Sequence, residues 1–126
     1  IMNIPKIKKI NKVGIIIIAT NKYIKFFDNL YNSCERFLFP KCNKTYFLMS
    51  NKSIPDYKDV VKIDILHEQW PNPTLKRYHY ISDNKDRFKE MDYLVYIDVD
   101  CKLIRYVDEN ILPEYFNVVK HCGFYK

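Results

Sequence analysis

The residues best suited to chemistry in this chain are two carboxylates one residue apart, Asp98 and Asp100. They follow the apolar run 93–97, which is typical of a strand buried in a sheet. In open α/β folds, ligands bind at the carboxyl ends of the strands, where these acids would lie. Two carboxylates there can hold a hard divalent cation, and that cation can bind a phosphate. The alternative is that both residues only form the turn that ends a strand, where aspartate is common.

The scarcity of glycine favours a cation over other devices for binding phosphate. The chain contains two glycines, Gly14 and Gly123. A P-loop and a dinucleotide-binding fold each need several glycines at fixed spacing, because the backbone must approach the phosphates closely. Neither pattern occurs, so if this chain binds a nucleotide, a cation on Asp98 and Asp100 is the available substitute for a glycine-rich loop.

The elements that must position these acids alternate between strand and helix patterns. Apolar runs predict four strands, at 14–19, 46–49, 60–66 and 93–97, and segments 102–106 and 118–119 are candidates for two more. Apolar residues at three- and four-residue steps predict helices over 24–38 and 74–88, and Thr20 with Asn21 offers cap chemistry before the first helix. This order predicts an α/β fold with a mostly parallel sheet and helices on both faces.

Length, charge and cysteine spacing narrow the class of protein. The 126 residues fit one domain, and the net charge of +6 comes from scattered lysines that are typical of a solvated surface. Attraction to a phosphorylated substrate and peripheral contact with an anionic membrane are the functional alternatives. We expect no nucleic-acid partner, because no motif of a known module appears. The four cysteines lack the spacing of a zinc site, so we expect reduced thiols.

Two enzyme classes place Asp-x-Asp after a buried strand. In haloacid-dehalogenase-like phosphotransferases the first aspartate is the nucleophile, and the motif continues to Thr or Val where this chain has Lys102. That class usually carries the motif near the start of the chain. Nucleotide-sugar glycosyltransferases of the GT-A fold carry it after about a hundred residues of α/β structure. A third alternative is a non-catalytic module that binds carbohydrate or membrane.

Four stretches make the resemblance specific: ATNKYIKFF at 19–27, RYHYISD at 77–83, MDYLVYIDVD at 91–100 and HCGFY at 121–125. In this order the chain resembles glycosyltransferase family 6, which includes the blood-group A and B transferases and α-1,3-galactosyltransferase. The resemblance implies a Rossmann-like GT-A fold. We therefore expect residues 1–126 to be a single incomplete domain, the UDP-binding half of such an enzyme.

The resemblance also implies roles for individual residues. The nucleotide would contact Ile18, Ala19, Thr20, Tyr23, Asp98, Val99 and Asp100. Asp98 and Asp100 would hold Mn²⁺ or another divalent cation. The donor pocket would include Trp70 and Arg77, and the pocket for the acceptor and the transferred sugar would include His121 and Gly123. The flanking prolines at 71 and 73 depart from the family pattern.

The implied activity is that of a retaining α-glycosyltransferase, a metal-dependent hexosyltransferase. It would move Gal or GalNAc from UDP-Gal or UDP-GalNAc to a glycan acceptor that contains a galactoside. The family's catalytic glutamate lies beyond the matching segment, so the resemblance assigns no catalytic residue to this chain. It implies a location in the cytoplasm or at the inner membrane for a bacterial member, and in the Golgi lumen for a eukaryotic one.

Overall fold

A computed structural model describes residues 10–67, 72–112 and 118–119. Five strands carry the fold: β1 (Lys12–Ile18), β2 (Asn43–Ser50), β3 (Val60–Asp64), β4 (Tyr93–Tyr96) and β5 (Val118–Val119). The helices are α1 (Phe27–Phe37) and α2 (Asn72–Asp83), and three short 3-10 turns are η1 (Asn21–Phe26), η2 (Lys85–Phe88) and η3 (Glu109–Ile111).

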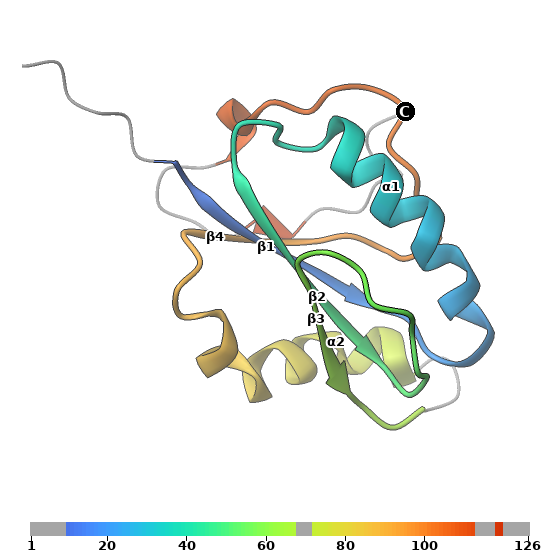
Figure 1. Cartoon of the computed structure of the whole chain (residues 1–126). Helices are drawn as coiled ribbons and strands as arrows, with labels where there is room; N and C mark the ends of the chain where they lie inside the picture. The colour runs from blue at the N-terminus through green and yellow to red at the C-terminus, as the bar shows by residue number, and fades with distance from the viewer. Residues whose placement is uncertain (1–9, 68–71, 113–117, 120–126) are drawn as a thin grey trace, which may run out of the picture.

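All five strands belong to one parallel sheet with the order β3-β2-β1-β4-β5 (Figure 1). After β1 the chain builds outward through β2 and β3, then crosses back to place β4 on the other side of β1. Successive strands are therefore added on one side of β1 up to β3 and on its other side from β4 onward. This arrangement confirms the predicted α/β class and its parallel sheet.

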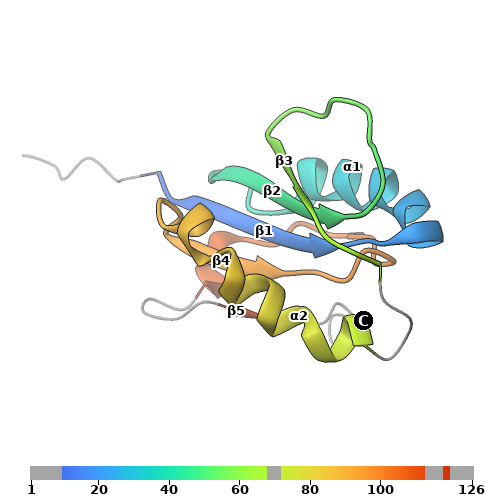
Figure 2. The same ribbon diagram turned by 90° about the horizontal axis from the view of Figure 1, so that it is seen from below.

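The two helices cover opposite faces of the sheet (Figure 2). Alternate residues of β1 point to opposite faces, as a strand requires. Val13, Ile15 and Ile17 lie in the hydrophobic cluster that contains α1. Ile16 lies in a second cluster, which has Ile81 of α2 packed against it. Both faces of β1 are therefore buried, which explains its continuous apolar sequence.

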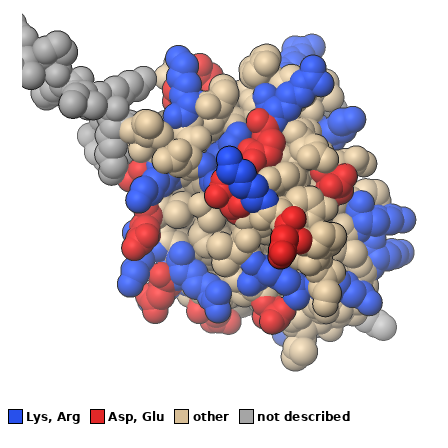
Figure 3. Space-filling model, viewed as in Figure 1, with Lys and Arg blue, Asp and Glu red and all other residues tan. Residues whose placement is uncertain are grey.

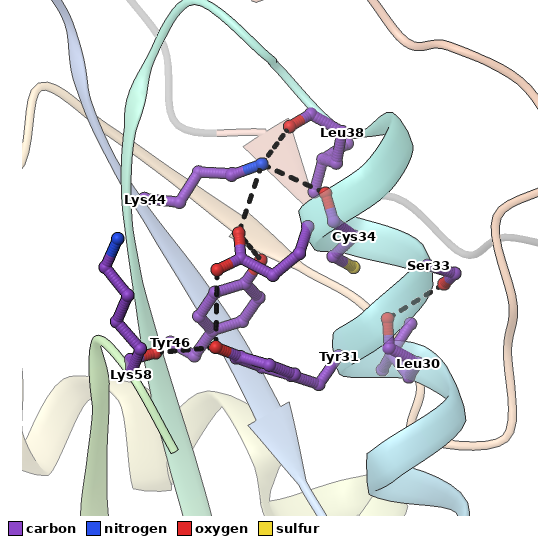
Figure 4. A network of polar contacts seen from close by, with 9 residues as sticks. Leu30, Tyr31, Ser33, Cys34, Leu38, Lys44, Tyr46 and Lys58 are labelled. Atoms are coloured by element: carbon purple, nitrogen blue, oxygen red, sulfur yellow. Dashed lines mark hydrogen bonds and ion pairs between the residues drawn. The ribbon is translucent and has the colours of Figure 1, made fainter.

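The face beneath α1 contains a polar network that ties the helix to β2 (Figure 4). Lys44 of β2 donates hydrogen bonds to the carbonyl oxygens of Cys34 (3.0 Å) and Leu38 (2.6 Å), at the end of α1. Its ammonium group also lies 3.5 Å from the Glu35 carboxylate. A cation at this end complements the helix dipole and satisfies carbonyl groups that have no partner within the helix. Lys44 therefore caps α1.

Two tyrosines complete the network at Glu35. The Tyr46 hydroxyl donates to Glu35 at 3.2 Å, and this side chain is fully buried. The Tyr31 hydroxyl donates to the carbonyl of Lys58 at 2.9 Å and lies 3.3 Å from Glu35. Because every polar group named here has a partner, the network fixes α1 on the sheet without an unsatisfied buried group.

The face beneath α2 depends on a close approach at Gly14. A Cβ atom at this position would lie 2.7 Å from Leu94 Cδ2 and 3.0 Å from both Met91 Cγ and Phe47 Cε2. Real Cβ atoms essentially never come as close as the first of these distances, so a larger residue would force the Leu94 side chain or the strand to shift. Gly14 therefore serves packing within the sheet and not the binding of phosphate.

Three predicted features are wrong in detail. The first helix begins with the 3-10 turn η1, and Thr20, which precedes it, forms no cap hydrogen bond with its side chain. The second helix ends at Asp83, where the Asn84 side chain bonds the Tyr80 carbonyl at 2.8 Å and competes with the helix. Segment 102–106 is not a strand. The Leu103 amide instead donates to the Ser33 hydroxyl of α1 at 3.0 Å.

Candidate functional site at the carboxyl edge of the sheet

The predicted site segments meet where the sheet reverses, between β1 and β4. Ile16 is paired with Tyr96, and the Ile97 amide then donates to the Ile16 carbonyl at 3.1 Å. Continuing this register by two residues places Asp98 beside Ile18. In doubly wound sheets this reversal point is where ligands bind. The fold therefore brings the end of β1 and the two carboxylates to the ligand-binding edge.

The Asp-Val-Asp segment forms a tight turn after β4. The Cys101 amide donates to the Asp98 carbonyl at 3.1 Å, and Val99 is buried in the cluster beneath α1. Asp98 is half-buried and Asp100 is exposed. Val99 thus anchors the turn in the core, while the carboxylates on either side of it remain closer to solvent.

Two carboxylates suit a cation that a substrate completes. Within the described ranges, no three His, Cys, Asp or Glu side chains gather as potential metal ligands. Mg²⁺ and similar hard cations are commonly held by one or two carboxylates together with substrate phosphates. Asp98 and Asp100 would supply the hard oxygen donors of such a site, and the phosphates of a nucleotide would supply others. The pair therefore fits a nucleotide-bound cation better than a site built from protein ligands alone.

Arg77 of α2 reaches this edge through Tyr96. Its guanidinium carbon lies 5.4 Å from the centroid of the Tyr96 ring. Burial, the charge of Asp98 and a hydrogen bond to that carboxylate raise the pKa of Tyr96, and the charge of Arg77 and a hydrogen bond to it oppose the shift. The structure thus joins the predicted residues Arg77 and Asp98 through a tyrosine that the sequence analysis missed. The sequence could have indicated this tyrosine, because Tyr96 and Asp98 are two residues apart and therefore lie on the same side of an extended chain.

The end of β1 supplies the other side of the site. The Ala19 amide donates to the Met49 carbonyl at 2.9 Å, so the sheet continues past Ile18. Ala19 and Thr20 are buried, Ile18 is half-buried and the Tyr23 side chain is 45% exposed. Tyr23 is therefore free to cover a planar group at this edge, as the resemblance implies.

Two contacts at this edge were not predicted. Thr20 Oγ1 lies 3.0 Å from Nδ1 of His67, which follows β3. The Asn21 amide donates to Asn51 Oδ1 at 2.9 Å, and Asn51 Nδ2 donates to Asn21 Oδ1 at 2.7 Å. Asn21 has a φ of 50°, a left-handed conformation that asparagine tolerates better than most residues. These contacts hold the loop after β1 against the loops after β2 and β3.

Three predicted site residues, Trp70, His121 and Gly123, lie outside the described residues, and their roles stay predictions. The expectation of reduced thiols is confirmed for Cys34 and Cys42, which are free. It is wrong for Cys101, which is disulfide-bonded. Burial raises the pKa of the Cys34 thiol to about 12, so this cysteine is a poor nucleophile in the folded protein.

Comparison with known proteins identifies the family of this chain. The model of glycosyltransferase family 6 matches residues 4–126. The chain is 26% identical to the O-antigen biosynthesis glycosyltransferase WbnI of Escherichia coli, across 74% of this chain and 41% of the relative. It is also 26% identical to histo-blood group ABO system transferase 2 of Rattus norvegicus, across 90% of this chain and 37% of the relative. The chain thus spans about two fifths of the length of these relatives, and it belongs to glycosyltransferase family 6.

Proposed function

We propose that this chain is the donor-binding half of a retaining α-glycosyltransferase that moves Gal or GalNAc from a UDP-sugar to a galactoside-containing glycan. One observation carries the proposal. The end of β1, the Asp-Val-Asp turn and Arg77 meet at the point where the parallel sheet reverses. Family membership favours a transferase over the phosphotransferase and over the non-catalytic module.

Each part of this edge has a task in holding the donor. The backbone of Ala19 and Thr20 would bind the uracil, and the exposed ring of Tyr23 would cover it. Asp98 and Asp100 would hold Mn²⁺ against the diphosphate. That cation would neutralise the charge that develops on UDP as the sugar leaves.

Arg77 would bind the donor from the α2 side of the site. Its Nε atom is buried and has no hydrogen-bond partner among the described residues. A guanidinium presents several donors in a fixed plane, which suits hydroxyl groups and carboxylates. An oxygen of the donor sugar would satisfy this atom.

The names of the relatives support a glycan acceptor, because one is an O-antigen biosynthesis glycosyltransferase and another a histo-blood group transferase. The distribution of charge on the surface does not narrow the choice of acceptor further. Figure 3 shows Lys and Arg interspersed with Asp and Glu over most of the face that carries α1. Among the described residues, no helix has both the length and the apolar character that crossing a membrane requires.

The experiment measures binding of UDP to this chain by calorimetry, with and without MnCl₂. We expect Mn²⁺ to strengthen binding, and we expect no transfer by this chain alone. In the presence of Mn²⁺ the variant Asp98→Asn/Asp100→Asn should bind UDP about 10-fold or more weakly than the unaltered chain. Its affinity for UDP should no longer respond to the metal.

The matched control is Asp83→Asn/Asp86→Asn. It removes the same two charges from exposed positions in the segment that leads into β4, at the opposite edge of the sheet. This control should bind as the unaltered chain does. Equal, metal-dependent binding by both variants would refute the metal site, and binding of a galactoside glycan without UDP or metal would favour the carbohydrate-binding module.

A further inference from the structure

Tyr96 is held rigidly at the last position of β4. Its backbone pairs with Ile16 of β1 on one side and with Val119 of β5 on the other. Its ring is 7% exposed and lies in the cluster beneath α2, with Phe47 and Phe88 among its members. A strand paired on both sides has little freedom to move. The tyrosine ring is therefore a fixed support from which a neighbouring group can be oriented.

The hydroxyl of this ring is the part that packing does not explain. A phenylalanine would fill the same apolar space, and burying a hydroxyl costs free energy unless it is hydrogen-bonded. Asp98 lies two residues further along the extended chain, on the same side as Tyr96, and the Arg77 guanidinium carbon lies 5.4 Å from the ring centroid, so both groups are placed to bond the hydroxyl. Hydrogen bonds to both are among the causes that shift the pKa of Tyr96. A guanidinium can only donate, so the phenol oxygen accepts from Arg77 and gives its single proton to the Asp98 carboxylate.

This arrangement fixes two site residues with one group. The bond to Tyr96 occupies one lone pair of the Asp98 carboxylate and leaves its other lone pairs for a cation. Arg77, which comes from a different element, is held against the same ring at 5.4 Å. Groups that orient metal-binding carboxylates and histidines commonly govern metal affinity without touching the metal.

We propose that Tyr96 is a positioning residue of the donor site, which orients Asp98 for the nucleotide-bound cation and holds Arg77 beside it; this rests on the proposed function. The substrate class it serves is a nucleoside diphosphate with a divalent cation. Tyr96 does not contact either ligand, and its effect passes through Asp98.

Calorimetry on Tyr96→Phe tests this proposal, with UDP titrated in the presence and absence of MnCl₂. The variant removes one oxygen and keeps the packing of the ring, so the chain should fold, as circular dichroism would verify. We expect the affinity for UDP with Mn²⁺ to fall about 10- to 100-fold. Affinity for UDP without metal should change less than about threefold, because only the metal-dependent part passes through Asp98.

Tyr46→Phe is the matched control. Tyr46 is also a buried tyrosine whose hydroxyl donates to a carboxylate, but it faces α1 and its partner is Glu35. This control should lower thermal stability and leave both affinities unchanged. A second control combines Tyr96→Phe with Asp98→Asn, and the added tyrosine change should have no further effect on affinity.

The outcomes separate this proposal from the proposed function. If Asp98→Asn abolishes the metal response but Tyr96→Phe binds as the unaltered chain does, Tyr96 has no positioning role and the function stands. If Tyr96→Phe loses the same affinity for UDP with and without Mn²⁺, Tyr96 has a structural role only. If the unaltered chain shows no metal response at all, the proposed function fails first.

Discussion

The same chemical pair, a buried tyrosine bonded to a carboxylate, occurs beneath both helices but in different surroundings. Beneath α1, Glu35 accepts from Tyr46 and is paired with Lys44, which in turn caps the helix. Beneath α2, Tyr96 bonds Asp98 at the open edge of the sheet, and Arg77 keeps a buried Nε atom without a partner among the described residues.

The difference indicates what each pair does. A network whose members satisfy one another contributes to stability and offers nothing to a ligand. A network that ends at the reversal point of a parallel sheet with an unsatisfied donor can be completed by a ligand. We therefore assign the α1 face to stability and the α2 face, with its edge, to binding. The predictions that follow test this assignment.

The largest expected effect is on the core of the α1 face. Phe27 is 1% exposed, and its ring centroid lies 5.8 Å from that of Tyr31 and 5.2 Å from that of Tyr57. Phe27→Ala should lower the free energy of unfolding by about 3–5 kcal/mol, measured by urea denaturation. Phe88→Ala, beneath α2, should cost less, because within the described part of the chain its ring pairs with one other ring, that of Phe47. The reverse order would contradict the assignment of the α1 face to stability.

A smaller effect is expected where the α1 network depends on its cation. Lys44→Met leaves Glu35 without its ion pair and the last carbonyls of α1 without their cap. Because hydrogen bonds to charged groups contribute more than neutral ones, we expect a loss of about 2 kcal/mol in urea denaturation. The control Lys41→Met changes an exposed lysine nearby and should stay within about 0.5 kcal/mol of the unaltered chain. Affinity for UDP should not change in either variant, and a loss with Lys44→Met alone would link the two faces.

A third effect is confined to alkaline pH. Burial, followed by the charge of Glu35, raises the pKa of Tyr31 to about 12, above its ordinary value of 10.0. The unfolded chain therefore releases this proton first. The stability contribution is complete below pH 10 and is lost as the pH rises toward 12.

Urea midpoints between pH 9 and pH 12 would measure this loss. Tyr31→Phe should be less stable than the unaltered chain at pH 9, and its midpoint should fall less steeply with pH. Parallel curves for the two proteins would show that Tyr31 does not carry the alkaline transition.

Much of this fold follows from local patterns in the sequence. The β-branched run that became β1 and the apolar steps of α1 are strong signals, because they reflect burial on two faces and on one face respectively. The boundaries were less accurate, since Asn84 and the η1 turn respond to individual hydrogen bonds. Segment 102–106 has the composition of a strand but has its backbone bonded to Ser33, a contact that no local pattern contains.

Neighbouring residues were enough to predict the alternation of strands and helices, the two acids at a strand end and the family to which they point, because each is a local property of the chain. Which residues those acids meet depends on contacts between elements that are far apart in the chain. Parallel pairing of β4 with β1 places Asp98 beside Ile18, and the packing of α2 on the sheet brings Arg77 to Tyr96. Both faces of the sheet carry a buried tyrosine beside a carboxylate. They differ because Glu35 of α1 faces Lys44 of β2, whereas Asp98 lies at the carboxyl edge of the sheet, where doubly wound folds bind their ligands.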